Sequence, residues 1–466
     1  MTQTIAIIGG GIAGISTAYS CSLIDPTAEV VLVEAEKQLA YHTTGRSAAL
    51  LYENYGEASV RGLTRASLNF YHNTPEGLVD APLLSLRPLI HAGTAEQSDL
   101  IDELIADGSD GTIPTQEITV MEALDLFPAL NISRVERAII EIGTADIDVS
   151  ALHQAFVRGF RRNNGQIVTS ARVDSATREK NGWKIEATTG EFGADVVINA
   201  SGAWGDVVAK RAGIEPIGLN PKRRTAFMVT APVPETSEWA MLDDAAHSWY
   251  IKPDGPQLLC SPADETPSEP CDAKPLEEDI ALAIERINTA TTLNIRSVNS
   301  SWAGLRTFTT DRSMVIGPDP DEPSFIWCVG QGGTGIQTSP AAGQLTAELA
   351  INGKIKKYPE KLEAPFYFGD VRFRWDPNKK AYVSYGDLGI ANVNKRQVMK
   401  YVKGKIVVSK RITGNDITIY LQLDDKNYYY FNYKRGLMQV YSSNEEFNTV
   451  ISETKKDETK FKGEKD

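Results

Sequence analysis

Residues 4–14 read TIAIIGGGIAG, and this stretch decides the fold class of the N-terminal part of the chain. The apolar run at 4–8 predicts a β-strand, and the small and apolar residues at 12–24 predict a helix. Gly9, Gly11 and Gly14 give the spacing GxGxxG where the two meet. In this motif one glycine permits a tight turn, one lets the backbone approach a diphosphate, and one lets the helix pack on the strand. The stretch therefore predicts a nucleotide site.

The second predicted strand, EVVLVE, ends in Glu34, which follows Gly14 by 20 residues. A carboxylate at this spacing accepts hydrogen bonds from both hydroxyls of an adenosine ribose, and its charge repels the 2′-phosphate of NADP. The pattern favours an adenine dinucleotide. It does not separate FAD from NAD, because both contain the same adenosine diphosphate half.

Composition and charge exclude several classes of protein. The 466 residues are 42% hydrophobic and 23% charged, as in globular proteins, and at roughly 150 residues per domain they allow about three domains. The net charge of −13 argues against nucleic acid and anionic membranes as partners. Short β-branched runs alternate with amphipathic stretches such as SALHQAFVRGFRR, which predicts an α/β fold with a parallel sheet.

The cysteines and the N-terminal residues indicate where the protein works. Cys21, Cys260, Cys271 and Cys328 are widely spaced and form no CxxC pair, so neither a zinc site nor a disulfide framework is expected. The N-terminal residues lack the features of a secretory signal, and no apolar run reaches the roughly 18 residues of a membrane span. We expect a cytoplasmic protein without a transmembrane segment.

The character of the chain changes near residue 358. Residues 1–357 hold 28 Lys+Arg and 46 Asp+Glu, whereas residues 358–466 hold 20 and 15 and contain 11 of the 17 tyrosines. Alternating segments such as DITIYLQL, YYYFNY and LMQVYSS, with the turn DDKN, predict antiparallel hairpins. We expect a β-rich appendage at 358–450, of native or foreign origin, and a charged disordered tail at 451–466.

Several segments of the body carry a resemblance to a known family. They are HTTGRSAA after Glu34, ADIDVSALHQ, VVINASGAW at 196–204, PKRRTAF, WAGLRTF at 302–308 and GQGGTGIQTSPAAG at 330–343. Together they resemble the FAD-dependent D-amino acid oxidase superfamily, most closely the bacterial D-arginine dehydrogenase type. The resemblance covers residues 1 to about 357 and identifies the dinucleotide as FAD.

The resemblance implies a Rossmann-like FAD-binding domain that is interleaved with an α+β substrate domain. The FAD-binding domain is expected at 1–75, 147–222 and 300–357, and the substrate domain at 76–146 and 223–299. Some relatives attach FAD through a cysteine shortly after the WAGLR-type segment. The corresponding residues here, TFTTDRSMVIG, contain none, so FAD is expected to bind non-covalently.

The expected chemistry is the oxidation of an amino acid at its α-carbon. Such a substrate needs its carboxylate held and its Cα–H bond directed at the flavin, and guanidinium groups suit a carboxylate best. By resemblance Arg224 and Arg306 hold the carboxylate, with help from the hydroxyls of Tyr55 and Tyr250. On sequence alone an arginine in KRR is more often an exposed charge, and Arg223 is easily confused with Arg224.

The resemblance also assigns pocket and cofactor residues. Met241 lines the side-chain pocket, the carbonyl of Gly333 accepts from the substrate amine, and Gln337 orders that loop. The run TSP at 338–340 is typical of the cap and first turn of a helix, whose positive N-terminus would face the flavin. The expected FAD-binding residues are Gly9, Gly11, Ile12, Ala13, Gly14, Glu34, Ala35, Thr44, Arg46, Ser47, Ala48, Ala200, Gly202, Gly332, Gly335, Ile336, Gln337 and Thr338.

Two substrate-pocket positions depart from the D-arginine dehydrogenase pattern. Leu89 replaces the glutamate that contacts a cationic side chain, so arginine and lysine should be poor substrates, because burying an uncompensated charge is costly. Leu50 replaces a histidine, which leaves the amine proton to solvent, to a water or to a weaker acceptor such as Tyr55. No metal is expected, since no metal pair is evident among His42, His72, His91, His153 and His247.

Three functions remain open on sequence. The first is oxidative deamination of a neutral, mainly apolar D-amino acid, with oxygen or a quinone as electron acceptor. The second keeps the flavin and arginines but takes glycine, a secondary amine or a 2-hydroxy acid. The third is a flavin-bound protein without catalysis, suggested by the missing histidine and the dissimilar C-terminal residues.

Overall fold

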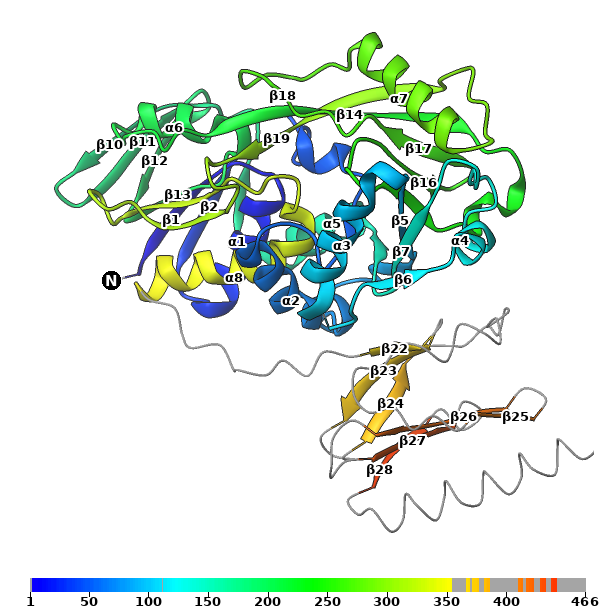
Figure 1. The fold of residues 1–466 in the computed structure, drawn as a ribbon. Helices are drawn as coiled ribbons and strands as arrows, with labels where there is room; N and C mark the ends of the chain where they lie inside the picture. The colour runs from blue at the N-terminus through cyan, green and yellow to red at the C-terminus, as the bar shows by residue number, and fades with distance from the viewer. Residues whose placement is uncertain are drawn as a thin grey trace, which may run out of the picture. The chain divides into compact units, whose positions relative to one another are not determined.

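The computed structural model describes residues 2–110 and 112–353 and, beyond them, seven strand segments between 366 and 441 (Figure 1). Contacts divide the chain into two compact units with sheets of their own. The larger unit comprises Met1–Gly111 and Thr115–Glu360, and the smaller one comprises Thr112–Pro114 and Lys361–Asp466.

The larger unit contains twenty-one strands and eight α-helices within its described residues. The strands are β1 (Thr4–Ile8), β2 (Glu29–Val33), β3 (Leu50–Leu51), β4 (Leu84–Leu86), β5 (Leu89–Gly93), β6 (Gln116–Ile118), β7 (Arg137–Glu141), β8 (Ala145–Ile147), β9 (Gln166–Val168), β10 (Val173–Glu179), β11 (Gly182–Ala187), β12 (Gly190–Ala194), β13 (Val196–Asn199), β14 (Asn220–Thr230), β15 (Met241–Asp244), β16 (Tyr250–Asp254), β17 (Gln257–Ser261), β18 (Thr266–Pro267), β19 (Ser300–Phe308), β20 (Val315–Pro318) and β21 (Phe325–Val329). The helices are α1 (Ile12–Ile24), α2 (Ala58–His72), α3 (Ser98–Asp107), α4 (Val120–Leu126), α5 (Val149–Arg162), α6 (Gly205–Arg211), α7 (Glu277–Ala290) and α8 (Gly335–Asn352).

A six-stranded sheet forms the nucleotide-binding part, with the strand order β20-β21-β13-β1-β2-β9. Its neighbours are parallel, except for the antiparallel pair of β20 and β21. β1 and α1 have the predicted bounds. Helices α5 and α8 both pack against α1, which explains why α1 is apolar and buried nearly all round (Figure 1). The parallel sheet and its first turn confirm the predicted Rossmann-like part.

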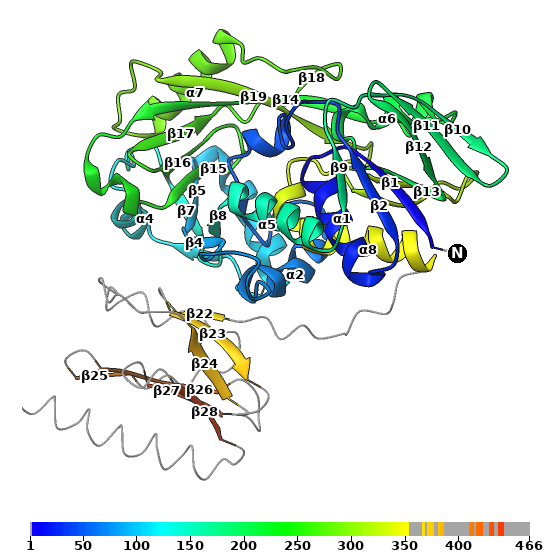
Figure 2. The same ribbon diagram turned by 180° about the vertical axis from the view of Figure 1, so that it is seen from behind.

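A small antiparallel sheet, β10-β11-β12, lies next to the six-stranded sheet (Figure 2). Trp183 and Ile185 of β11 share a buried cluster with Ala6 of β1, Val197 of β13 and Trp327 of β21. This cluster covers the face of the parallel sheet that the helices leave open. Both faces are thus buried, as parallel sheets require.

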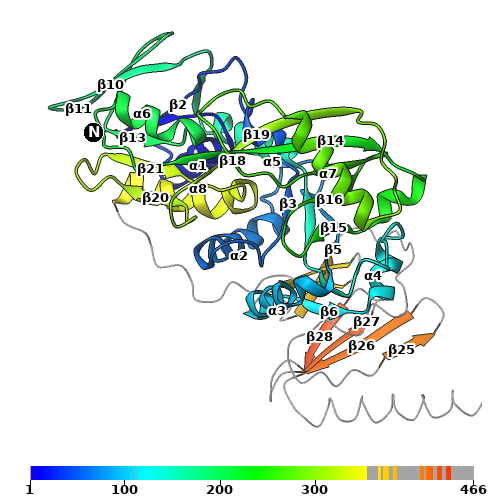
Figure 3. The ribbon, with the colours of Figure 1, turned by 45° about the horizontal axis from the view of Figure 1, so that its top comes forward.

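The substrate part is built on a nine-stranded mixed sheet, with the order β18-β14-β17-β16-β15-β5-β7-β6 and with β19 paired to β14. The pair of β15 and β5 is parallel, and the other pairs are antiparallel. Helices α4 and α7 contribute Ala123 and Ile287 to its core, beside Phe127, Phe227 and Leu258 (Figure 3). The strands of this sheet flank those of the parallel sheet in sequence, so the two domains are interleaved as predicted.

The start of α8 differs from the sequence prediction. The helix begins at Gly335 after the N-cap Thr334, so the run TSP at 338–340 lies inside it and Pro340 is an interior residue. A proline there leaves the carbonyl of Ile336 without its helical donor. The hydroxyl of Tyr71 on α2 donates to that carbonyl at 2.5 Å, and the hydroxyl of Ser339 donates to it at 2.9 Å. Tertiary packing therefore permits a proline that local preference would place in the first turn.

The smaller unit has a seven-stranded antiparallel sheet in the order β22-β23-β24-β28-β27-β26-β25. The predicted strands DITIYLQL, YYYFNY and LMQVYSS correspond to β26, β27 and β28. The turn DDKN, most of GKIVVSK and the predicted disordered tail at 451–466 lie outside the described residues. The strands are β22 (Phe366–Phe368), β23 (Val371–Asp376), β24 (Ala381–Tyr385), β25 (Lys410–Thr413), β26 (Asp416–Gln422), β27 (Tyr428–Asn432) and β28 (Leu437–Tyr441).

Among the described residues, no helix combines the length and the apolar character that crossing a bilayer demands.

Candidate active site

The glycine motif forms one wall of a cavity of about 350 Å³ at the start of α1. Gly9 and Gly11 line this cavity, and Gly14 lies behind them in the helix. A methyl group at Gly14 would overlap the carbonyl oxygen of Gly9, so only glycine allows this approach of helix and strand. The first turn of α1 contains no acidic residue, which leaves its positive end open to a diphosphate.

Glu34 lies where the sequence predicts a ribose ligand. Its carboxylate lines the cavity and accepts from the backbone N–H of Gly10 at 2.6 Å and of Glu36 at 2.8 Å. These two bonds fix the carboxylate, and its remaining lone pairs are able to accept from ribose hydroxyls. The glycine turn, the open helix end and the fixed carboxylate fit the adenosine diphosphate half of FAD.

Most of the other expected cofactor residues line the same cavity. The hydroxyl of Thr44 accepts from the N–H of Ile12 at 3.0 Å, and Arg46 donates to the carbonyl of Ala303 at 2.8 Å. These bonds tie the segment that contains Thr44 and Arg46 to α1 and to β19. The cavity-lining residues from the prediction are Gly9, Gly11, Ile12, Ala13, Glu34, Ala35, Thr44, Arg46, Ser47, Ala48, Ala200, Gly202, Gly332, Gly335 and Ile336. Gly14, Gln337 and Thr338 are not among the lining residues.

Three glycines before and at the start of α8 reach the same cavity, namely Gly332, Gly333 and Gly335. Gly333 has φ +92°, and a methyl group there would lie 2.6 Å from Nε of Arg306. Glycine is therefore required for this arginine to pack over the loop. The positive end of α8 meets the cavity, although the helix begins earlier than the TSP run suggests.

A second cavity, of about 330 Å³, adjoins the first. The two share the lining residues Ser47, Ala48, Arg224, Tyr250, Arg306, Gly333 and Ile336. A molecule in the second cavity would therefore meet a bound dinucleotide across this shared wall. The second cavity is the candidate substrate site.

Strand pairing explains which arginines reach the junction of the cavities. In the antiparallel pair of β14 and β19, Arg224 is opposite Gly304, two residues before Arg306. Because opposite residues share a face and side chains alternate along a strand, Arg224 and Arg306 point to one face and Arg223 to the other. Arg223 instead pairs with Asp279 at 2.9 Å.

The two guanidinium groups form a cationic site that lacks a full counter-charge. Arg306 has the hydroxyl of Tyr55 at 3.5 Å, and Arg224 has Glu265 at 3.4 Å and the carbonyl of Asp264 at 2.8 Å. Burial lowers the pKa of Arg224, and the charge of Arg306 lowers it further. Burial raises the pKa of Tyr55, but Arg306 and Arg224 outweigh burial, and the net shift is downward. An anion placed between these groups would relieve the repulsion.

Part of the wall of the substrate cavity is apolar. Leu89 of β5 and Met241 of β15 are neighbours in the parallel register, and Leu50 of β3 joins them. Tyr250 packs in the same cluster, and Tyr55 lies at its edge. This wall has the size and character to hold an aliphatic or thioether side chain.

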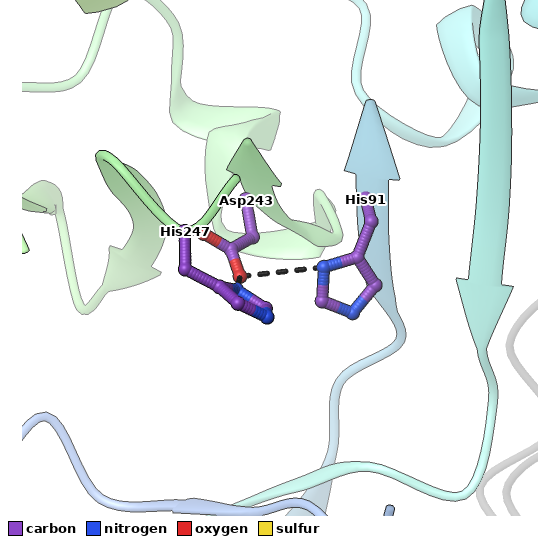
Figure 4. Close-up of side chains that lie close together, drawn as sticks. All are labelled: His91, Asp243 and His247. Atoms are coloured by element: carbon purple, nitrogen blue, oxygen red, sulfur yellow. Dashed lines mark hydrogen bonds and ion pairs between the residues drawn. The ribbon is translucent and has the colours of Figure 1, made fainter. Parts of the chain in front are cut away.

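A buried polar group adjoins the apolar wall and Tyr55, and sequence reasoning missed it. Asp243 and His91 follow Met241 and Leu89 by two residues and are themselves neighbours in the register of β15 and β5. His247, in the turn after β15, brings its Nδ1 to 2.5 Å from Oδ2 of Asp243, and Nδ1 of His91 lies 3.3 Å from the same oxygen (Figure 4). In the sequence, LIH at 89–91 and MLD at 241–243 each place an apolar residue and a titratable residue two positions apart, on the same face of a strand. This pattern was the signal that could have revealed the group.

The positions of these three residues differ with respect to the cavity. Asp243 and His247 line it, whereas His91 is fully buried behind them and has the hydroxyl of Tyr52 at 3.1 Å from its Nε2. Burial alone lowers the pKa of His247, but the Asp243 carboxylate raises it to about 9. At neutral pH the pair is an imidazolium and a carboxylate.

Gln337 holds the wall of the substrate cavity in place. Its Oε1 accepts from the backbone N–H of Tyr52 at 2.9 Å, and its Nε2 donates to Thr64 at 3.0 Å. It thus ties the start of α8 to the segment that carries Tyr55 and to α2. These bonds hold the segment at Tyr52, whereas the prediction concerned the loop at Gly333.

Comparisons with known proteins agree with this geometry. A family model described as FAD dependent oxidoreductase (DAO) matches residues 4–349, so the chain belongs to this family. It binds FAD and is an FAD-dependent oxidoreductase. FAD-dependent oxidoreductase domain-containing protein 1 of Mus musculus is 24% identical over 78% of this chain and 85% of its own. Glycine oxidase of Geobacillus kaustophilus is 25% identical over 59% of this chain and 70% of its own.

Solved structures show the same fold. L-proline dehydrogenase from P. horikoshii has a TM-score of 0.68 at 21% identity, covering 76% of this chain and 95% of its own. Glycine oxidase from Geobacillus kaustophilus has a TM-score of 0.68 at 22% identity, covering 77% and 97%. These similarities establish the FAD-binding and substrate domains of the fold.

Proposed function

We propose that the protein oxidises a neutral, apolar D-amino acid at its α-carbon, giving an imino acid that water hydrolyses to a 2-oxo acid and ammonia. The observation that carries the proposal is the pair of buried guanidinium groups, Arg224 and Arg306, at the junction of the two cavities. Their uncompensated charge suits an α-carboxylate. A cation would be repelled there.

The residues around this pair define how a substrate is held. The carboxylate binds Arg224 and Arg306, with the hydroxyls of Tyr55 and Tyr250 beside it, and the amine faces the carbonyl of Gly333. Bound FAD supplies the acceptor for the hydride that leaves the α-carbon. Holding the carboxylate and the amine at two separate points fixes the orientation of the Cα–H bond, which is the main contribution of such a site.

The side chain of the substrate would lie against Leu50, Leu89 and Met241. Leu89 is almost fully buried and offers no charge to an arginine or lysine substrate. The particular likeness to D-arginine dehydrogenase is supported by the motifs HTTGRSAA, PKRRTAF, WAGLR and GGTGIQTS, and the D configuration follows from that likeness and from no residue pattern. The first motif is the segment 42–49, which lines the cofactor cavity. The next two contain Arg224 and Arg306, and the last includes the start of α8.

A second candidate is a glycine-like compound, a secondary amine or a 2-hydroxy acid. Its support is the names of similar proteins, which include dimethylglycine dehydrogenase of Rattus norvegicus and L-2-hydroxyglutarate dehydrogenase of Indibacter alkaliphilus. The arginine pair would hold the carboxylate of any of these compounds. The electron acceptor after the flavin is oxygen or a quinone in either case.

The anaerobic visible spectrum of the purified FAD-loaded protein tests the proposal. D-methionine, D-leucine, D-phenylalanine and D-arginine are added in turn, followed by their L-forms, glycine, N-methylglycine and a 2-hydroxy acid. Bleaching by the apolar D-forms, with D-arginine much slower, is the expected result. Bleaching only by glycine, N-methylglycine or the hydroxy acid refutes the substrate class, and no bleaching at all refutes catalysis. Reoxidation by air or by a soluble quinone then identifies the acceptor.

A further inference from the structure

The pair of His247 and Asp243 is not needed to hold the carboxylate or the apolar side chain, yet it lines the substrate cavity. His247 stands in the turn between β15 and β16, with φ +50°, a left-handed conformation that histidine adopts more readily than most non-glycine residues. Its ring contacts Asp243 of the same hairpin and lines the cavity.

The two nitrogens of His247 have different surroundings. Nδ1 is 2.5 Å from Oδ2 of Asp243, which fixes the tautomer and the ring plane. The side chain remains 38% exposed, and its ring stands edge-on to Tyr55 with ring centroids 6.0 Å apart. A carboxylate that holds one imidazole nitrogen while the other is free is the arrangement of a general base.

We propose that His247, held by Asp243, accepts the proton of the substrate amine. The inference rests on the proposed oxidation of an amine. In this step an N–H bond of the substrate ammonium breaks and its electron pair stays on nitrogen. The proton binds Nε2 of His247, and the exposed edge of the ring later releases it to water. The step supplies the free amine that oxidation at the α-carbon requires. His247 would thus provide an imidazole near the substrate, in place of the histidine that the D-arginine dehydrogenase type has at the position of Leu50.

The groups around His247 determine when it is able to accept a proton. Asp243 and Asp244 lie at the end of β15, His91 lies on β5 with ring centroids 5.4 Å away, and Tyr55 contacts the ring edge-on. The carboxylates favour the imidazolium, so the pKa of His247 is about 9 and the ring is a base only toward and above that pH. The rate should therefore rise with pH through this range.

In the cluster of His91, Asp243 and His247, the hydrogen-bonded pair accounts for the contact of His247 with Asp243 without an ion, whereas Nδ1 of His91 and Oδ1 of Asp243 have no hydrogen-bond partner among the described residues. Their nearest ligand-type atoms lie within 4.8 Å of one another, as a metal site would require. A cation would have to displace the 2.5 Å contact of His247 with Asp243 and strip the proton from Nδ1. An ion bound there would prevent His247 from accepting a proton. The cluster is therefore either a metal site or the site of a general base, and not both.

The test uses the full-length FAD-loaded protein and anaerobic stopped-flow, with the limiting rate of flavin reduction by D-leucine measured from pH 6 to 10.5. Saturating substrate removes the ionisation of the free amino acid from the profile. We expect a rise controlled by one group near pH 9. His247→Asn should remove this rise and lower the limiting rate at high pH by about 100-fold, within the range for a lost general base.

Two carboxylate variants provide a matched comparison. Asp243→Asn should move the rise by more than one pH unit toward the ordinary histidine pKa of about 6.5. Asp244→Asn, one residue away and bonded to Gln97 and Ser248, should move it much less. Histidine-labelled protein followed by NMR gives a second readout, in which the His247 resonance titrates at the same pH as the rate and shifts equally in Asp243→Asn.

The outcomes distinguish this inference from the function on which it rests. If no amine reduces the wild-type flavin, both are refuted. If D-leucine or N-methylglycine reduces it and the pH rise is unmoved in His247→Asn and Asp243→Asn, only the role of His247 is refuted. A rate that EDTA abolishes and zinc restores would assign the cluster to a metal and would also overturn it.

Discussion

Replacing Arg224 by methionine should separate the recognition of the carboxylate from the stability of the fold. The side chain is 12% exposed and keeps only Glu265 and a backbone carbonyl as partners, and Glu265 retains Lys222 and Arg312 after the change. Two charge-assisted hydrogen bonds to a substrate carboxylate contribute about 3–5 kcal/mol together. At about 1.4 kcal/mol per tenfold change, kcat/KM for D-leucine should fall by about 100- to 4,000-fold.

The stability of Arg224→Met should be equal to or above that of the wild type. The pKa of Arg224 is lowered by burial and by Arg306, so the fold disfavours its charge and loses little when the charge is removed. Arg223→Met is the matched control, because the neighbouring side chain points to the opposite face and pairs with Asp279. It should leave kcat/KM unchanged and cost about 1–3 kcal/mol of unfolding free energy. Flavin reduction under anaerobic conditions and urea unfolding measure the two quantities. Equal losses of kcat/KM in both variants would refute the assignment of faces.

Three further changes test separate parts of the structure. Leu89→Glu should raise kcat/KM for D-arginine relative to D-leucine by about 10-fold or more, because a carboxylate then meets the cationic side chain of the substrate. Leu89→Gln is the control and should not change the ratio. An unchanged ratio in Leu89→Glu would mean that the substrate side chain does not lie against residue 89. Gly14→Ala should reduce FAD retention on gel filtration and lower Tm, because its methyl group overlaps the carbonyl of Gly9, and full FAD content would contradict this packing. Tyr71→Phe should cost about 1 kcal/mol in urea unfolding, because the carbonyl of Ile336 loses one of its two hydroxyl donors, and an unchanged midpoint would mean that Ser339 satisfies the carbonyl by itself.

The local signals in the sequence predicted the nucleotide part well. The strand at β1 and the helix α1 have the predicted bounds, and Glu34 lines the cavity at the predicted spacing from the glycines. These predictions were correct because the apolar run, the glycines and the carboxylate at the strand end all lie within about 30 residues of one another, where local sequence determines the structure. The helix α8 shows the limit of local preference, since Pro340 lies inside it where the hydroxyls of Tyr71 and Ser339 replace the missing donor.

The residue patterns predicted the α/β fold class and an adenine dinucleotide, because both signals lie in residues close together in the chain, and the family resemblance supplied FAD and the pair of arginines. The sequence by itself did not determine which face each arginine takes, which follows from the register of β14 with β19. Nor did it bring His91 and His247 to Asp243, since these residues come from β5, from β15 and from the turn after it. Proton chemistry in this cavity depends on charges placed within a few ångströms of one another, and only the tertiary structure sets those distances.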